Sequence, residues 1–151
     1  MQYKKNDKEE SCVYVDILDH RQYLEILSKI RKDTYKIVIV QIDGYKKDDP
    51  VVDTAMQMMP LEKKETVSRW FGTAAPGRQA VQYTFTKKRE FFGYLSSFEA
   101  FYIRRTGKKN CYELEYTDFG LDDIAFLDEN DELLFFTVTH EGFAFLNKKY
   151  L

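Results

Sequence analysis

The sequence predicts one α+β domain, built from an N-terminal β-α-β unit, one or two further helices and a C-terminal antiparallel β-meander. Three observations lead to this prediction. Residues 12–42 follow a pattern of strand, capped helix and strand; residues 99–146 have the pattern of short strands; and residues 133–138 are apolar at successive positions. The length of 151 residues suits a single domain. We therefore expect a polar lead-in over residues 1–10 and one domain over residues 11–151.

The segment 133–138, Leu-Leu-Phe-Phe-Thr-Val, is the strand on which we expect the domain to assemble. Side chains of a strand alternate between its two faces, so Leu133, Phe135 and Thr137 would point to one face and the other three to the opposite face. Both sets are largely apolar, which is typical of a strand that is covered on both sides.

The N-terminal unit begins with a strand over residues 12–18 and continues with a helix that starts at Asp19. Asp19 and Gln22 have the spacing of a capping box, apolar side chains recur at helical intervals, and cations crowd the last turn. A second strand, continuously apolar in its middle, covers residues 35–42. This order predicts two parallel strands joined by a right-handed crossover, with a helix packed on an antiparallel pair as the alternative.

The middle of the chain predicts two more helices. Asp53 is placed to cap a short helix that ends near Met59. Pro60 suits the first position of a further helix that ends near Trp70, because proline lacks a backbone N–H that the first turn of a helix leaves unpaired anyway.

The rest of the chain predicts one short helix among strands. Residues 80–86 alternate as a half-buried strand, and Thr86 is placed to cap the helix that follows. A hairpin then turns at residues 107–110, and strands near residues 124–127, 133–138 and 143–146 complete the meander. The expected register of the hairpin sets Phe101 opposite Tyr116, Ile103 opposite Leu114 and Arg104 opposite Glu113.

Cysteine content and hydropathy favour a soluble, cytoplasmic protein without a membrane partner. Cys12 and Cys111 are far apart and are expected to be reduced and buried. The first residues are charged with no apolar stretch behind them, which argues against a secretory signal. No apolar run approaches the roughly 18 residues that a membrane span requires.

Charge is unevenly distributed along the chain, although the net charge is only −2. Residues 60–109 hold eleven Lys and Arg against four Asp and Glu, whereas residues 110–151 hold two against ten. The two segments either neutralise one another in the fold or create a two-faced surface.

The leading functional hypothesis is a non-catalytic binding protein that acts through protein–protein contact. An inhibitor, or an immunity-type antidote of a toxin enzyme, would have such a composition, and its acidic face would dock a basic partner. The acidic residues proposed for this contact are Asp118, Asp122, Asp123, Asp128, Glu129 and Asp131.

An alternative hypothesis places a nucleic acid or an anionic ligand on the basic segment 70–109. Three successive cations at the start of the predicted helix are unfavourable for its dipole, and an anion would offset them. The negative net charge and the lack of any known nucleic-acid-binding motif weigh against it. The residues of this alternative site are Trp70, Arg78, Lys87, Lys88 and Arg89.

A second alternative is metal-dependent hydrolysis by the carboxylates of residues 118–131 with His140. The acidic run does not have the spacing of a calcium-binding loop, and His140-Glu141 lacks the second histidine of a zinc-protease helix. We therefore expect no catalytic residue, no bound metal and no cofactor. The partner's identity and the oligomeric state are left open by the sequence.

Overall fold

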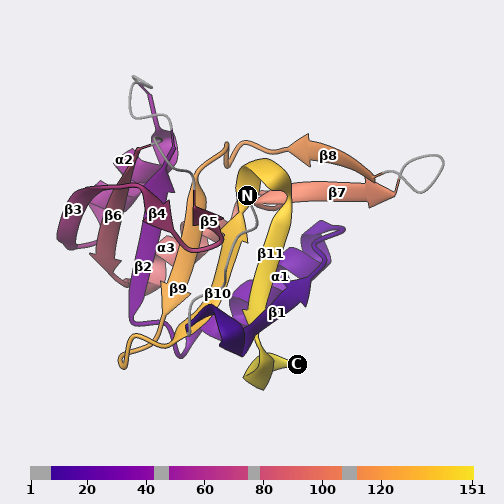
Figure 1. Ribbon diagram of the computed structural model, residues 1–151, viewed down its shortest axis with the longest axis horizontal. Coiled ribbons are helices and arrows are strands. Elements are labelled where there is room, and N and C mark those ends of the chain that lie inside the picture. Colours follow the sequence, from indigo (N-terminus) through magenta and orange to yellow (C-terminus); the bar gives the residue numbers. More distant parts are fainter. Residues whose placement is uncertain (1–7, 43–47, 75–78, 107–111) are drawn as a thin grey trace.

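A seven-stranded sheet forms the centre of the structure, a computed structural model that describes residues 8–42, 48–74, 79–106 and 112–151 (Figure 1). Each strand of this sheet runs antiparallel to its neighbours. The predicted α+β class is confirmed. The strands, in spatial order, are β1 (Cys12–Val15), β11 (Phe143–Asn147), β10 (Leu133–Val138), β9 (Asp123–Leu127), β2 (Lys36–Gln41), β6 (Ala80–Thr86) and β3 (Leu61–Val67).

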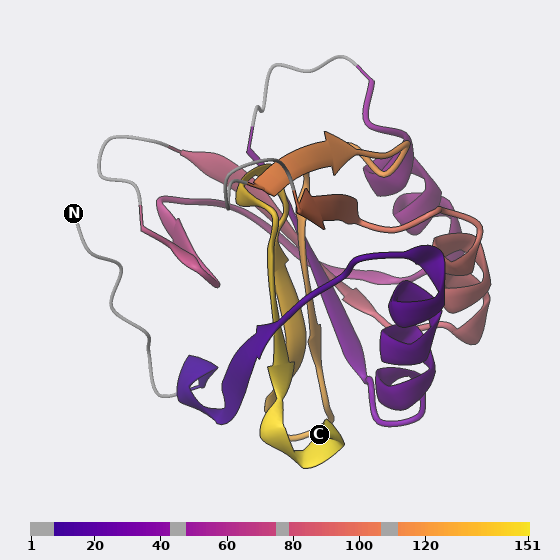
Figure 2. The ribbon, with the colours of Figure 1, turned by 90° about the vertical axis from the view of Figure 1, so that its right-hand side faces the viewer.

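Three helices cover one face of the sheet, namely α1 (His20–Arg31), α2 (Pro50–Met58) and α3 (Arg89–Ser96) (Figure 2). The opposite face carries a small hairpin, β4 (Arg69–Trp70) with β5 (Thr73–Ala74), and the short 3-10 helix η1 (Glu9–Ser11) (Figure 2). Two further 3-10 turns, η3 (Thr139–Glu141) and η4 (Lys148–Tyr150), flank β11. None of the helices described is long and apolar enough to cross a membrane.

Strand β10 is buried along its whole length, as predicted for the organising strand. The predicted alternation is wrong at its start, because the register against β9 shifts between Leu133 and Phe135. Such a bulge places successive residues on the same side of the sheet. Leu134 and Phe135 therefore join the core beneath the helices, whereas Leu133 and Phe136 join the core on the opposite face.

Strands β1 and β2 run parallel, as the β-α-β pattern predicts, but they are not neighbours. The antiparallel strands β11, β10 and β9 lie between them, so the connection through α1 spans three strands. Sequence order alone did not indicate this insertion, since the three intervening strands come from the end of the chain.

Helix α1 begins where its sequence predicts. The carboxylate of Asp19 accepts a hydrogen bond from the Gln22 backbone N–H at 2.9 Å, and Gln22 Oε1 accepts one from the Leu18 N–H at 2.7 Å. The other two helix starts differ from prediction. Helix α2 is capped by Asp49, not by Asp53, and Pro50 is its first residue.

The helix predicted from Pro60 is wrong, because residues 61–67 form the edge strand β3. This strand pairs with β6 along its length, and Thr86, which was predicted to cap α3, ends β6 instead. Charged side chains at exposed positions are typical of an edge strand. The gain from completing the sheet outweighs the local preference for a helix, which is a weak preference at such positions.

The hairpin predicted after residue 99 forms a separate two-stranded ribbon, β7 (Tyr102–Thr106) with β8 (Tyr112–Tyr116) (Figure 1). Its register is one residue away from the prediction, since Tyr102 faces Tyr116 and Arg104 faces Leu114. The alternation rule fails here because Tyr102 and Ile103 are both buried, so neither marks a solvent face. The predicted turn at residues 107–110 lies outside the described residues.

Candidate binding site

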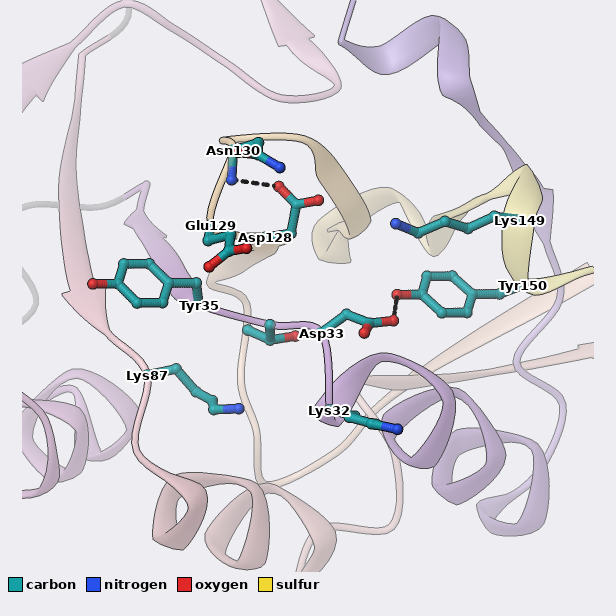
Figure 3. Close-up of a pocket in the computed structure, with 10 residues that line it drawn as sticks. Lys32, Asp33, Tyr35, Lys87, Asp128, Glu129, Asn130, Lys149 and Tyr150 are labelled. Atoms are coloured by element: carbon teal, nitrogen blue, oxygen red, sulfur yellow. Dashed lines mark hydrogen bonds between the residues drawn. The ribbon is translucent and has the colours of Figure 1, made fainter.

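A polar hollow of about 620 Å³ opens at one end of the sheet (Figure 3). Strands β2 and β10 begin at this edge, and strands β6, β9 and β11 end there, so the segments that connect them to the rest of the chain meet at one place. The hollow is thus assembled from the end of α1, the β9–β10 turn, the start of the β6–α3 connection and η4. Its lining residues are Lys32, Asp33, Thr34, Tyr35, Lys87, Asp128, Glu129, Asn130, Lys149 and Tyr150.

The β9–β10 turn presents a rigid acidic rim. The Asp128 carboxylate accepts hydrogen bonds from the backbone N–H groups of Asn130 and Glu132, both at 2.9 Å, and so fixes the shape of the turn. Asp131 pairs with Lys36 at 3.2 Å. Glu129 is exposed and has no ion pair or hydrogen bond within the described part of the chain, so its carboxylate is available to a partner.

Two of the three lysines that line the hollow are held, each in a different way. Lys87 Nζ donates a hydrogen bond to the Arg31 carbonyl at the end of α1, at 2.9 Å. Burial and the nearby Arg31 charge lower the pKa of Lys87, although Asp33 partly offsets them. Lys149 lies 3.6 Å from the Glu132 carboxylate.

Tyrosine side chains supply the remaining walls. The Tyr150 hydroxyl donates a hydrogen bond to the Asp33 carboxylate at 2.6 Å (Figure 3), and burial together with this carboxylate raises the pKa of Tyr150. Tyr35 is 48% exposed beside the turn. The hollow therefore combines charges of both signs with tyrosine, a residue type that is enriched at protein–protein contacts.

The structure divides the acidic residues predicted from the sequence between the two ends of β9. Asp128, Glu129 and Asp131 follow the strand and lie at or near the hollow, whereas Asp118 and Asp122 precede the strand and Asp123 is its first residue. Asp118 is exposed, but Asp122 and Asp123 are buried and offer no surface to a partner.

The residues of the alternative anion site are also separated. Lys87 lines the hollow, and Lys88 and Arg89 are exposed at the start of α3. Trp70 is buried on the opposite face of the sheet, and Arg78 lies outside the described residues.

Trp70 and Asp123, which the sequence placed in different sites, bind each other inside the protein. The Asp123 carboxylate accepts hydrogen bonds from Trp70 Nε1 and from the Thr139 backbone N–H, both at 2.8 Å. His140 Nδ1 lies 4.0 Å from the same carboxylate. Burial raises the pKa of Asp123 to about 7, because desolvation of the charged form outweighs these donors. Nothing in the spacing of the chain indicated this pairing.

The raised pKa of Asp123 predicts that the protein loses stability as the pH rises. Between its ordinary value of 3.8 and about 7, the folded protein keeps a proton that the unfolded chain has released. The contribution of Asp123 to the free energy of unfolding is therefore complete below about pH 4 and is lost as the pH rises through about 7. Asp123→Asn should flatten this decline in urea denaturation.

The matched control is Asp118→Asn, which changes an exposed carboxylate near the same end of β9. The amide of Asp123→Asn faces two donors with a single acceptor oxygen, so we expect a loss of about 1–3 kcal/mol at acidic pH. The loss should shrink at alkaline pH, because only the wild type then has to bury a charged carboxylate at this position. An identical pH dependence in wild type and Asp123→Asn would contradict the assignment.

No group of three or more His, Cys, Asp and Glu is placed to hold a metal ion anywhere in the described ranges. The carboxylates of residues 118–131 are divided between opposite ends of β9, and His140 lies beside the buried Asp123. This arrangement does not favour the hydrolase alternative.

The chain was also compared with known proteins. No family model, curated protein or solved structure matches it. Arguments about function therefore depend on the geometry of its own residues.

Proposed function

We propose that this protein is a non-catalytic binding protein that recognises another protein at the polar hollow. The observation that supports this most directly is Glu129, a carboxylate without a partner among the described residues, on a turn whose backbone is fixed by Asp128. A rigid turn loses little conformational entropy when a partner binds. A basic side chain of the partner would reach Glu129, and the aromatic side chain of Tyr35 would contact its aliphatic part.

An inhibitor or immunity-type antidote is the kind of protein that would use such a contact. A basic enzyme surface, such as that of a nuclease, complements the acidic rim formed by Asp128 and Glu129, and charge complementarity speeds association. Lys32, which has no ion pair among the residues described, would meet an acidic residue at the opposite rim.

Charge reversal tests this proposal. We expect Glu129→Lys to reduce retention of the partner from native extract at least tenfold, measured by quantitative pull-down, because a repulsive charge replaces an attractive one in the contact. The matched control is Asp118→Lys, which reverses the charge of an exposed residue at the opposite end of β9. Both variants should keep the circular dichroism spectrum of the wild type.

The outcome shows whether the acidic residues after β9 or those before it contact the partner. A protein retained by wild type and by Asp118→Lys, but lost from Glu129→Lys, supports the hollow. Equal retention by all three proteins contradicts it, and loss only from Asp118→Lys would move the contact to the start of β9.

The nucleic-acid alternative has less support. Trp70, the aromatic side chain proposed to frame the anion, is buried against Asp123 and cannot stack on a base. Filter binding with RNA and DNA at two salt concentrations tests this alternative, since phosphate contacts predict a steep loss of affinity with salt.

A further inference from the structure

A second depression, a groove of about 430 Å³, lies between helices α1 and α3. Its floor contains Leu27 and Phe92, which are nearly inaccessible, and Leu24 on its edge is 37% exposed. The groove adjoins the polar hollow, because Lys87 in the hollow donates to the carbonyl of Arg31, which lines the groove. Figure 2 shows the two helices side by side on the same face of the sheet.

Gly93 lies in the middle of α3, where no contact with another described residue calls for glycine. Glycine in a helix interior destabilises the helix relative to alanine. A Cβ atom added at Gly93 would have no heavy atom of the described residues within 4 Å, so none of these neighbours requires the missing side chain. Gly93 lines the groove. Glycine at this position leaves room for a backbone from outside the molecule to approach α3 closely.

The rims of the groove are positively charged. Arg31 from the last turn of α1 and Arg89 from the first turn of α3 are both exposed, and neither side chain has an ion pair in the part of the chain that the structure describes. Lys87 lies next to Arg31, and the Arg31 charge adds to burial in lowering the pKa of Lys87. Two exposed guanidinium groups are suited to bind carboxylates in pairs of hydrogen bonds.

We infer that the groove between α1 and α3 docks an acidic amphipathic helix of a protein partner. The helix would place its backbone against Gly93, its apolar side chains against Leu24 and its carboxylates against Arg31 and Arg89. This contact shares with the proposed function only the assumption that the partner is a protein. The ring of Phe92 is nearly inaccessible, so the groove offers little aromatic surface on which nucleic-acid bases could stack, whereas Leu24 on its edge offers apolar surface to a polypeptide.

The experiment uses a labelled synthetic peptide of about 15 residues with a leucine stripe and glutamates at helical spacing. Fluorescence anisotropy measures its binding to the full chain. We expect Gly93→Leu to weaken binding at least tenfold by filling the groove, and Arg31→Glu with Arg89→Glu to weaken it similarly. The charge control is Arg69→Glu, an exposed arginine of β4 on the opposite face of the sheet, which should leave the affinity within twofold.

Gly93→Ala is the control for folding. Because the added methyl group meets open space, this variant should keep or raise the melting temperature, by about 1–4 °C, while it still reduces peptide affinity. A folded Gly93→Leu protein that binds the peptide as well as wild type overturns the inference. The inference is also overturned if a single-stranded DNA oligonucleotide binds as tightly as the peptide and Gly93→Leu does not change its affinity. That result would show that the groove attracts ligands by charge alone.

The test is separable from that of the polar hollow. Unchanged peptide binding in Gly93→Leu, together with loss of the captured partner in Glu129→Lys, would remove the groove and leave the hollow as the contact. The reverse pattern would retain the groove and remove the hollow.

Discussion

Replacing Phe135 with alanine is expected to lower the free energy of unfolding by about 3–5 kcal/mol. The Phe135 ring is fully buried under the helices, and its centroid lies 5.9 Å from those of Phe101 and Phe126. Removing it leaves a cavity that a β-strand paired on both sides cannot close. Because domains of this size are stable by only about 5–15 kcal/mol, the change should be evident in urea denaturation.

The control for this variant is Tyr35→Ala, which removes an aromatic ring of similar size that is half exposed. We expect its effect on unfolding to stay below about 1 kcal/mol. Similar losses of stability in Phe135→Ala and Tyr35→Ala would show that β10 is not the centre of the fold.

A second large effect is expected from Gly72→Ala, in the turn that joins β4 to β5. Gly72 has a φ of +77°, a left-handed conformation that disfavours any side chain, and a Cβ here would overlap Val138 Cγ2 on β10. Strain and overpacking together should cost about 2–4 kcal/mol. Thermal unfolding followed by circular dichroism measures this cost.

Gly120→Ala distinguishes backbone strain from the close approach. Gly120 also has a positive φ, of +90°, but an added Cβ would meet open space. We expect Gly120→Ala to cost only about 1–2 kcal/mol, so the difference from Gly72→Ala reports the contact between the hairpin and the sheet. Equal costs would argue that the hairpin does not pack closely on β10.

The contact of Gly72 with β10 also explains how the second face of the sheet is covered. Trp70 binds Asp123 of β9, and the Gly72 N–H donates to the Glu9 carboxylate at 2.9 Å. Glu9 is buried, although the sequence predicted a polar lead-in over residues 1–10. The hairpin and η1 are thus held by polar contacts between parts of the chain that are distant in sequence.

Local chemistry explains the parts of the fold that the sequence predicted correctly. The cap of α1 depends on Asp19 and Gln22, three residues apart, and any chain with this spacing can form it. The meander of β9, β10 and β11 follows from short apolar runs separated by turn residues, including Asp128. The predicted helix from Pro60 was wrong because pairing with β6, about twenty residues later, decides the conformation of β3.

By itself, the sequence determined the fold class and the buried strand at residues 133–138, and it nominated acidic and basic residues for binding. The tertiary structure alone decided which of these residues meet. It placed Asp128, Glu129 and Lys87 around one hollow and buried Asp123 against Trp70. The physical reason is the sequence separation of the residues that interact. Caps and turns depend on neighbours a few residues away. The grouping of side chains at a surface depends on strand order, and strand order depends on pairing between distant parts of the chain.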